Sequence, residues 1–67
     1  MSMYTIKVHD GMRGLETILM EDHEEYEVGQ TISIAPNVPI TVQDQHGNGF
    51  RLTPKMSLSG TVIEKRY

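Results

Sequence analysis

Hydrophobic and polar residues alternate near the start of this chain in a pattern that predicts a β-strand. In residues 4–9, Tyr4, Ile6 and Val8 would face one side of the strand, and the intervening polar residues the other. This period of two is typical of a strand with one buried face. Aspartate and glycine follow at once, and a further glycine follows closely, so residues 10–14 are predicted to form a loop.

The same alternation returns twice in the middle of the chain. Residues 31–35 predict a strand with Ile32 and Ile34 facing inward, and residues 40–43 predict the next strand. Because proline donates no hydrogen bond to a sheet, the proline-bracketed residues 36–39 are predicted to connect the two. Three apolar residues would share one face of the second strand: Val38, Ile40 and Val42.

A hairpin is predicted within residues 45–50, because the dipeptide Asn48-Gly49 suits the positive φ values of a tight turn. Residues 50–53 would form the return strand, which ends at the following proline.

The last predicted strand covers residues 56–67 and is interrupted by Gly60. Two interpretations of this glycine remain open. The register continues through it, so that the preceding apolar residues share a face with Val62, or Ile63 is the core residue and Gly60 marks a bulge or bend.

The stretch from residue 15 to residue 21 fits either a strand or a helix. As a strand it would place Ile18 and Met20 opposite a second set: Leu15, Thr17 and Leu19. As a helix it would carry an apolar stripe: Met12, Leu15, Ile18, Leu19 and Tyr26. Gly14 and the repulsion among closely spaced carboxylates disfavour the helix. The strand is therefore preferred, followed by an acidic loop at 21–25 and a turn at 26–30.

These elements predict an all-β domain of five to six short strands separated by glycine and proline. We expect an antiparallel meander that closes into a small barrel, SH3-like or OB-like, or a two-sheet roll. The alternative is an α+β domain in which one helix near residues 15–26 packs on a sheet.

The chain has 67 residues, which corresponds to one small domain, and it contains no cysteine, which excludes disulfides and Cys-based zinc sites. No apolar run approaches the roughly 20 residues that cross a membrane, and the first residues lack the apolar region of a signal peptide. We therefore expect a soluble cytoplasmic protein without a membrane partner.

Charge is distributed unevenly along the chain. The formal net charge is −3, but residues 14–50 contain seven acidic residues and no Lys or Arg. The rest of the chain carries an excess of basic residues. Such asymmetry is informative about binding partners rather than about fold.

Five carboxylates fall within residues 21–27, and this run is the strongest candidate for a binding surface. The candidate partner-binding residues are Glu16, Met20, Glu21, Asp22, Glu24, Glu25, Tyr26 and Glu27, with Asp44 as a possible addition. The alternative interpretation, a solvated loop that keeps a small protein soluble, is the more common role of such a run. A divalent-cation site is disfavoured because the spacing of a calcium-binding loop is absent.

Other kinds of chemistry have weaker support. His9, His23 and His46 each lie near a carboxylate but lack metal-ligand spacing, and no nucleophile occupies a catalytic motif, so neither a cofactor nor enzymatic activity is expected. A nucleic-acid-binding barrel would use a different set of residues: Lys7, Arg13, Arg51, Lys55, Lys65 and Arg66 with Tyr4, Phe50 and Tyr67. The acidic net charge disfavours it.

The preferred hypothesis is a non-enzymatic acidic interaction module, or inhibitor, that docks on a basic surface of a protein partner. Small chains without cysteine or motif are often accessory proteins of phages or mobile elements, and a nucleic-acid-handling host enzyme, with its basic cleft, is a sensible class of target. A third hypothesis is an assembly subunit that oligomerises through strand edges. The sequence leaves the oligomeric state open.

Overall fold

The computed structural model describes residues 2–9 and 14–67, and within them it forms one six-stranded antiparallel sheet. The strands are β1 (Ser2–Val8), β2 (Thr17–Asp22), β3 (Thr31–Ile34), β4 (Ile40–Gln43), β5 (Gly49–Leu52) and β6 (Leu58–Arg66). The prediction of an all-β domain is confirmed. The alternative helix near residues 15–26 is wrong, because Thr17–Asp22 pairs with β1 as a strand.

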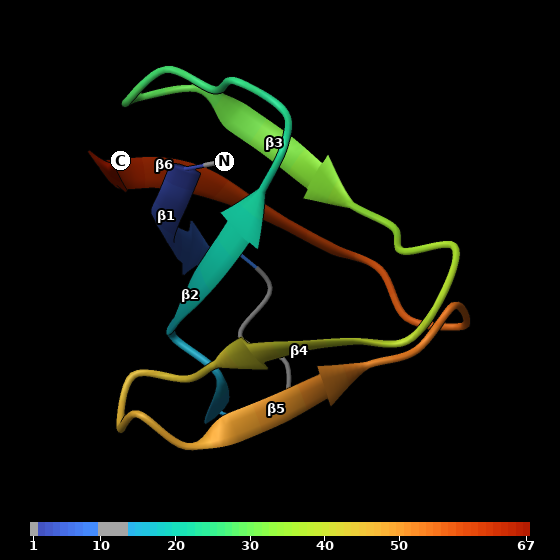
Figure 1. Cartoon of the computed structure of the whole chain (residues 1–67). Helices are drawn as coiled ribbons and strands as arrows, with labels where there is room; N and C mark the ends of the chain where they lie inside the picture. The colour runs from blue at the N-terminus through green and yellow to red at the C-terminus, as the bar shows by residue number, and fades with distance from the viewer. Residues whose placement is uncertain (1, 10–13) are drawn as a thin grey trace.

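The strand order is β3-β6-β1-β2-β4-β5, so the predicted simple meander is wrong. The sheet is also not a closed barrel, because β3 and β5 form its two edges among the described residues. The chain forms a small β roll, with the long strand β6 crossing behind β1 and the β4–β5 hairpin lying away from β3 (Figure 1).

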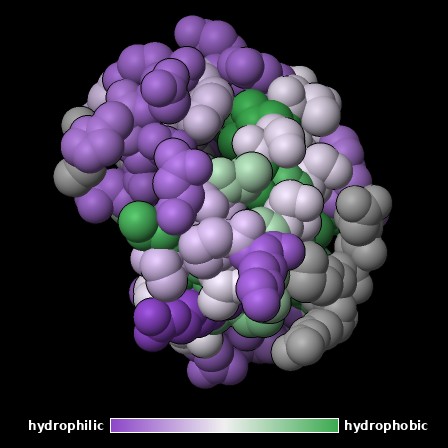
Figure 2. Space-filling view, turned by 90° about the vertical axis from the view of Figure 1, so that its right-hand side faces the viewer, coloured by the Kyte–Doolittle hydropathy of each residue, from purple (hydrophilic) through white to green (hydrophobic). Residues whose placement is uncertain are grey.

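The core lies on one face of this sheet. Tyr4 and Ile6 of β1 are fully buried, and they pair directly with Met20 and Ile18 of β2. Ile32 and Ile34 are buried as predicted. The opposite face carries mostly polar side chains, as the alternation requires. Figure 2 shows one side of the molecule on which hydrophobic side chains remain visible between hydrophilic ones.

Gly60 lies in the core face of β6, between Leu58 and Val62, so the interpretation in which the register continues is the correct one. A Cβ at this position would lie 2.5 Å from the carbonyl oxygen of Lys7. Only glycine permits β1 and β6 to approach so closely. The alternative that placed Ile63 in the core is wrong, since that side chain is 48% exposed.

A register shift between β1 and β6 follows immediately after Val62. Ile6 pairs with Val62, whereas Thr5 pairs with Glu64, so Ile63 is the extra residue of a β-bulge. An extra residue reverses which face the later side chains occupy. Lys65 consequently lies opposite Tyr4 and on the core side of the sheet.

The predicted β4–β5 hairpin forms, but its turn is displaced from Asn48-Gly49. The amide of Gly47 donates to Asp44 O at 3.0 Å, and the amide of Asp44 donates to Asn48 O at 2.9 Å. Gly47 has the positive φ of 81°, which matches a three-residue hairpin loop that ends in a left-handed glycine. Gly49 is already the first residue of β5.

Three further predictions need correction or lie outside the described residues. The acidic run is only partly a loop, because β2 continues through Glu21 and Asp22. Val38 does not share the core face of β4, since it precedes the strand and is 64% exposed. The predicted loop at 10–14 falls on undescribed residues apart from Gly14, and Met12 and Arg13 are among those undescribed.

Candidate functional site

The acidic run forms an ordered segment at one end of β2, here called the acidic arm and defined as residues 21–27. Its first two residues complete β2, and the remaining five lead towards β3. Fixing five loop residues costs conformational entropy, so the contacts that hold them must offset that cost.

Tyr4 is the main attachment point of the acidic arm. Its hydroxyl donates to the carbonyl oxygen of Glu24 at 2.8 Å and accepts from the amide of Tyr26 at 3.1 Å. The Tyr26 ring packs edge-to-face on the Tyr4 ring, with centroids 5.1 Å apart. A fully buried tyrosine in the central strand thus holds the backbone of the arm on both sides of Glu25.

Asp22 provides a second attachment within the arm. One carboxylate oxygen accepts from the amide of Glu24, and the other accepts from the Tyr26 hydroxyl, both at 3.1 Å. Desolvation, and after it the hydrogen bond to Asp22, raises the pKa of Tyr26 to about 12. The tyrosine therefore remains protonated as a donor across the physiological range.

The far end of the arm is closed by a turn against β6. Gln30 donates its amide to Glu27 O and accepts the Glu27 amide at its side-chain oxygen, each at 3.0 Å. Gly29, with φ of 94°, donates to Val62 O at 2.7 Å. These bonds use backbone groups of Glu27 and leave its exposed carboxylate pointing to solvent.

Lys65 neutralises one of the five carboxylates. The β6 bulge brings its ammonium group 2.8 Å from Glu25 Oε2 and 6.0 Å from the centre of the Tyr4 ring. Its side chain is only 14% exposed, whereas that of Glu25 is 63% exposed. The hydrogen bond and charge of Lys65 lower the pKa of Glu25. Glu25 is therefore a structural residue of the arm as well as a candidate for binding.

Three carboxylates of the arm are exposed and make no ion pair with the described part of the chain: Glu21, Glu24 and Glu27. Within the described structure, the hydrogen bonds of Glu24 and Glu27 involve only their backbone groups. The arm therefore presents a cluster of negative charge, because the described contacts that hold the arm in place do not use these three carboxylates. Its local potential is attractive to cations and basic groups.

Not all of the predicted partner-binding residues belong to this surface. Glu16 precedes β2 at its opposite end, where its amide donates to the side chain of Gln45 at 3.1 Å. Asp44 also lies towards that end, where it accepts the amides of His46 and Asn48. Met20 is only 4% exposed, so it lies in the core beneath this surface and offers little area for contact with a partner.

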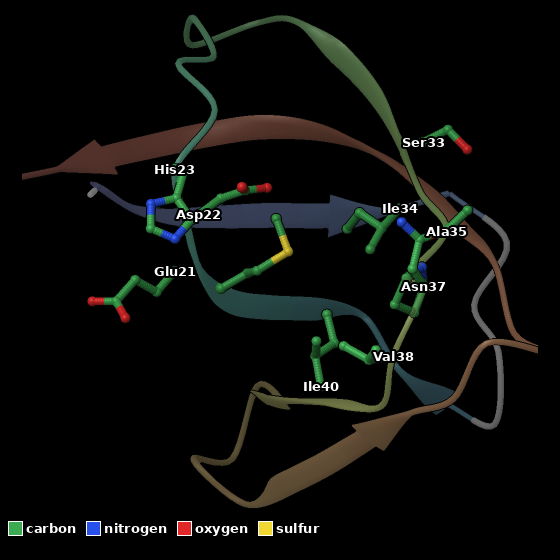
Figure 3. A pocket seen from close by; sticks show the side chains of 11 residues that line it. Glu21, Asp22, His23, Ser33, Ile34, Ala35, Asn37, Val38 and Ile40 are labelled. Atoms are coloured by element: carbon green, nitrogen blue, oxygen red, sulfur yellow. The ribbon is translucent and has the colours of Figure 1, made fainter.

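A groove of about 610 Å³ adjoins the acidic arm, and sequence reasoning did not identify it. Its apolar lining includes Met20, Ile34, Val38 and Ile40. Figure 3 shows Asp22 and His23 on one side of this groove, Ile34 and Asn37 on the other, and Ile40 below. The groove thus joins one acidic wall to one largely apolar wall, formed by the connection between β3 and β4.

Several residues of the alternative stacking platform for nucleic acid are engaged elsewhere in the described structure. Tyr4 is fully buried, and Lys65 is engaged by Glu25. Phe50 packs against the core, and Arg13 lies outside the described residues. Tyr67, which is 93% exposed, retains a ring available for stacking.

The three histidines lie at separate places in the described structure. His9 Nε2 lies 2.7 Å from the hydroxyl of Thr61 on the sheet, His46 is in the β4–β5 turn, and His23 is at the groove. Within residues 2–9 and 14–67, no three His, Asp or Glu side chains are grouped to hold a metal ion.

Comparison with known proteins identifies no relative: no protein-family model, curated protein or solved structure matches this chain. In the part of the chain that the structure describes, no helix is long and apolar enough to span a membrane. Its function is therefore inferred from the geometry of the arm and the groove.

Proposed function

We propose that this protein is a non-enzymatic binding module that docks its acidic arm on a basic surface of a protein partner. The supporting observation is that Tyr4, Asp22 and Gln30 hold the arm through backbone groups, while three carboxylates remain exposed. Such an arm is ordered before binding, which lowers the entropy cost of association.

Electrostatics would act mainly on encounter and orientation. Exposed charges of one sign accelerate association with an oppositely charged partner and disfavour partners of like charge. Because the arm is surrounded by solvent, this attraction should weaken as salt rises. A nucleic-acid-handling enzyme, whose basic cleft binds phosphates, remains the preferred class of partner, and inhibition by occupying that cleft is the expected consequence.

The test compares two variants with the same net charge. Glu24→Gln with Glu27→Gln removes two charges from the arm, and Glu16→Lys reverses one charge at the other end of β2. Both change the formal net charge from −3 to −1. None of the three side chains takes part in the hydrogen bonds that hold the arm, so both proteins should fold normally.

Immobilised wild type and both variants are incubated with cell extract, and any captured protein is purified for kinetic measurement. The arm variant should associate on the order of tenfold more slowly at low salt, whereas Glu16→Lys should resemble wild type. Equal association rates for the two variants would show that overall charge, and not the arm, governs binding.

Direct titration with labelled DNA and RNA separates this proposal from the nucleic-acid alternative. The acidic-module proposal expects no binding at low salt. Salt-sensitive binding that is lost on Arg51→Gln and Arg66→Gln would favour the basic surface instead.

A further inference from the structure

The groove beside the acidic arm has a buried apolar base and an exposed apolar edge. Met20 and Ile34 are 4% and 7% exposed, and Ile40 is half-buried against the same core. Val38 lines the groove from the β3–β4 connection with 64% of its surface exposed. A single exposed valine is ordinary, but one at the edge of an apolar depression marks a candidate contact.

The two walls of the groove differ in chemistry. Asp22 and His23 line one side, with Glu21 at its outer edge and its carboxylate directed away from the groove (Figure 3), and no charged residue among those that the structure describes lines the opposite side. No Lys or Arg of the described chain lines the groove. An apolar side chain in this position would therefore have the Asp22 carboxylate beside it on one flank only, which favours a basic neighbour there.

We infer that the groove binds an aliphatic side chain from an extended segment of the protein partner, flanked by Lys or Arg that faces Asp22 on the acidic wall. This inference rests on the proposed function and specifies what the basic surface must contain. The aliphatic group supplies buried apolar area, and the adjacent basic group sets its orientation against the acidic wall.

The chemistry of the walls disfavours other occupants. A nucleic-acid backbone would bring phosphates to a side that already carries carboxylates, which costs free energy through like-charge repulsion. A globular surface without a protruding side chain would leave the groove unfilled, and an unfilled apolar space loses its dispersion contacts.

The test uses two labelled synthetic peptides, one with leucine between lysines and one with serine replacing that leucine. Fluorescence anisotropy at low salt measures their affinity for the full chain. Wild type should bind the leucine peptide about tenfold more tightly, as expected for burial of one aliphatic side chain.

Two protein variants locate the contact. Val38→Ser should lower the affinity for the leucine peptide on the order of threefold and leave the affinity for the serine peptide unchanged. Only the leucine side chain is expected to contact the groove. Val28→Ser is the matched control, since Val28 is 61% exposed but lies in the turn after the arm. Thermal unfolding should show that both variants remain folded.

The possible outcomes separate this inference from the proposed function. Equal affinity for both peptides, with both weakened by Glu24→Gln and Glu27→Gln, would overturn the groove inference and leave the acidic module intact. Absence of binding to either peptide at low salt would overturn both. Equal effects of Val38→Ser and Val28→Ser would place the apolar contact elsewhere and refute the groove assignment.

Discussion

The acidic arm and the β3–β4 connection form the two walls of one groove, yet they are held in place by different means. The arm is fastened by side-chain and backbone hydrogen bonds to Tyr4, Asp22 and Gln30. Within the described structure, no turn or side-chain hydrogen bond involves residues 35–39. That connection instead contains two prolines, whose rings restrict the backbone without the need for a hydrogen-bond partner.

This difference follows from composition. Five like charges repel one another, so an acidic segment stays compact only where neutral donors and one cation compensate the repulsion. The connection has no ionisable side chain and needs no such support. The charged wall should consequently respond to pH and to loss of donors, and the apolar wall to changes in chain stiffness.

The largest expected effect is the loss of stability when Gly60 is replaced, because the backbone around Gly60 supports both walls. Gly60 pairs with Ile32 on β3, and the neighbouring Val62 accepts the amide of Gly29 after the arm. Gly60→Ala would place Cβ 2.5 Å from Lys7 O, so we expect unfolding in urea to show a loss of about 3 kcal/mol.

Gly49→Ala is the control for that substitution, because its Cβ would meet Thr41 at an ordinary 3.7 Å. If both alanine variants lose similar stability, the close approach of β1 and β6 is not the cause. If amide hydrogen exchange at the arm and at β3 changes by different amounts in Gly60→Ala, the two walls do not share this support.

The second effect concerns the arm alone. Tyr4→Phe removes a hydroxyl that serves Glu24 O and the Tyr26 amide, leaving both partly buried groups without a partner. We expect a loss of about 2 kcal/mol in urea unfolding, together with faster exchange of the Tyr26 amide.

Tyr67→Phe controls for the loss of a tyrosine hydroxyl, since Tyr67 is 93% exposed. Unchanged exchange of the Tyr26 amide in Tyr4→Phe would mean that the arm is held by other contacts. The amides of Asn37 and Val38 should not respond in either variant.

The contrast also shows which features the sequence could predict. Alternation located most strands closely, and the ambiguity at 15–21 disappears because Ile18 and Met20 must face the same side as Ile6 and Tyr4. The displacement of the hairpin turn could not be predicted from the local sequence pattern. Glycines at 47 and 49 both permit positive φ, and only pairing of β4 with β5 selects the first.

The candidate site was predictable only in part. The acidic arm is a local feature of the sequence, whereas the groove joins residues 20–23 to residues 33–40. That proximity depends on the non-sequential strand order, which alternation does not encode. The pairing of Lys65 with Glu25 likewise depends on the one-residue bulge at Ile63, which reverses the parity of the last residues.

The pH dependence of stability provides the third way to separate the walls. Lys65 lowers the pKa of Glu25, so the stability that this pair contributes is present above the ordinary value of 4.5 and is lost as pH falls through the lowered folded-state pKa. Wild type should therefore exceed Lys65→Met in stability at neutral pH, and the difference should shrink in acid.

Urea unfolding of both proteins between neutral and acidic pH measures this difference. Arg66→Met serves as the control, because Arg66 is 67% exposed and pairs with Glu64 away from the arm. A difference between wild type and Lys65→Met that stays constant with pH would indicate that Lys65 contributes through packing on Tyr4 rather than through Glu25.

The smallest expected effect tests how the apolar wall is held. Pro39 is exposed, and its replacement by alanine removes little contact, so the main consequence is greater freedom of the unfolded chain. We expect Pro39→Ala to lower stability by about 0.5 kcal/mol and leave the exchange of the arm amides unchanged. Urea unfolding at several pH values should give the same small loss throughout, because the connection carries no titrating group. A loss that varied with pH, or that spread to the Tyr26 amide, would show that the two walls are coupled and that the distinction between them does not hold.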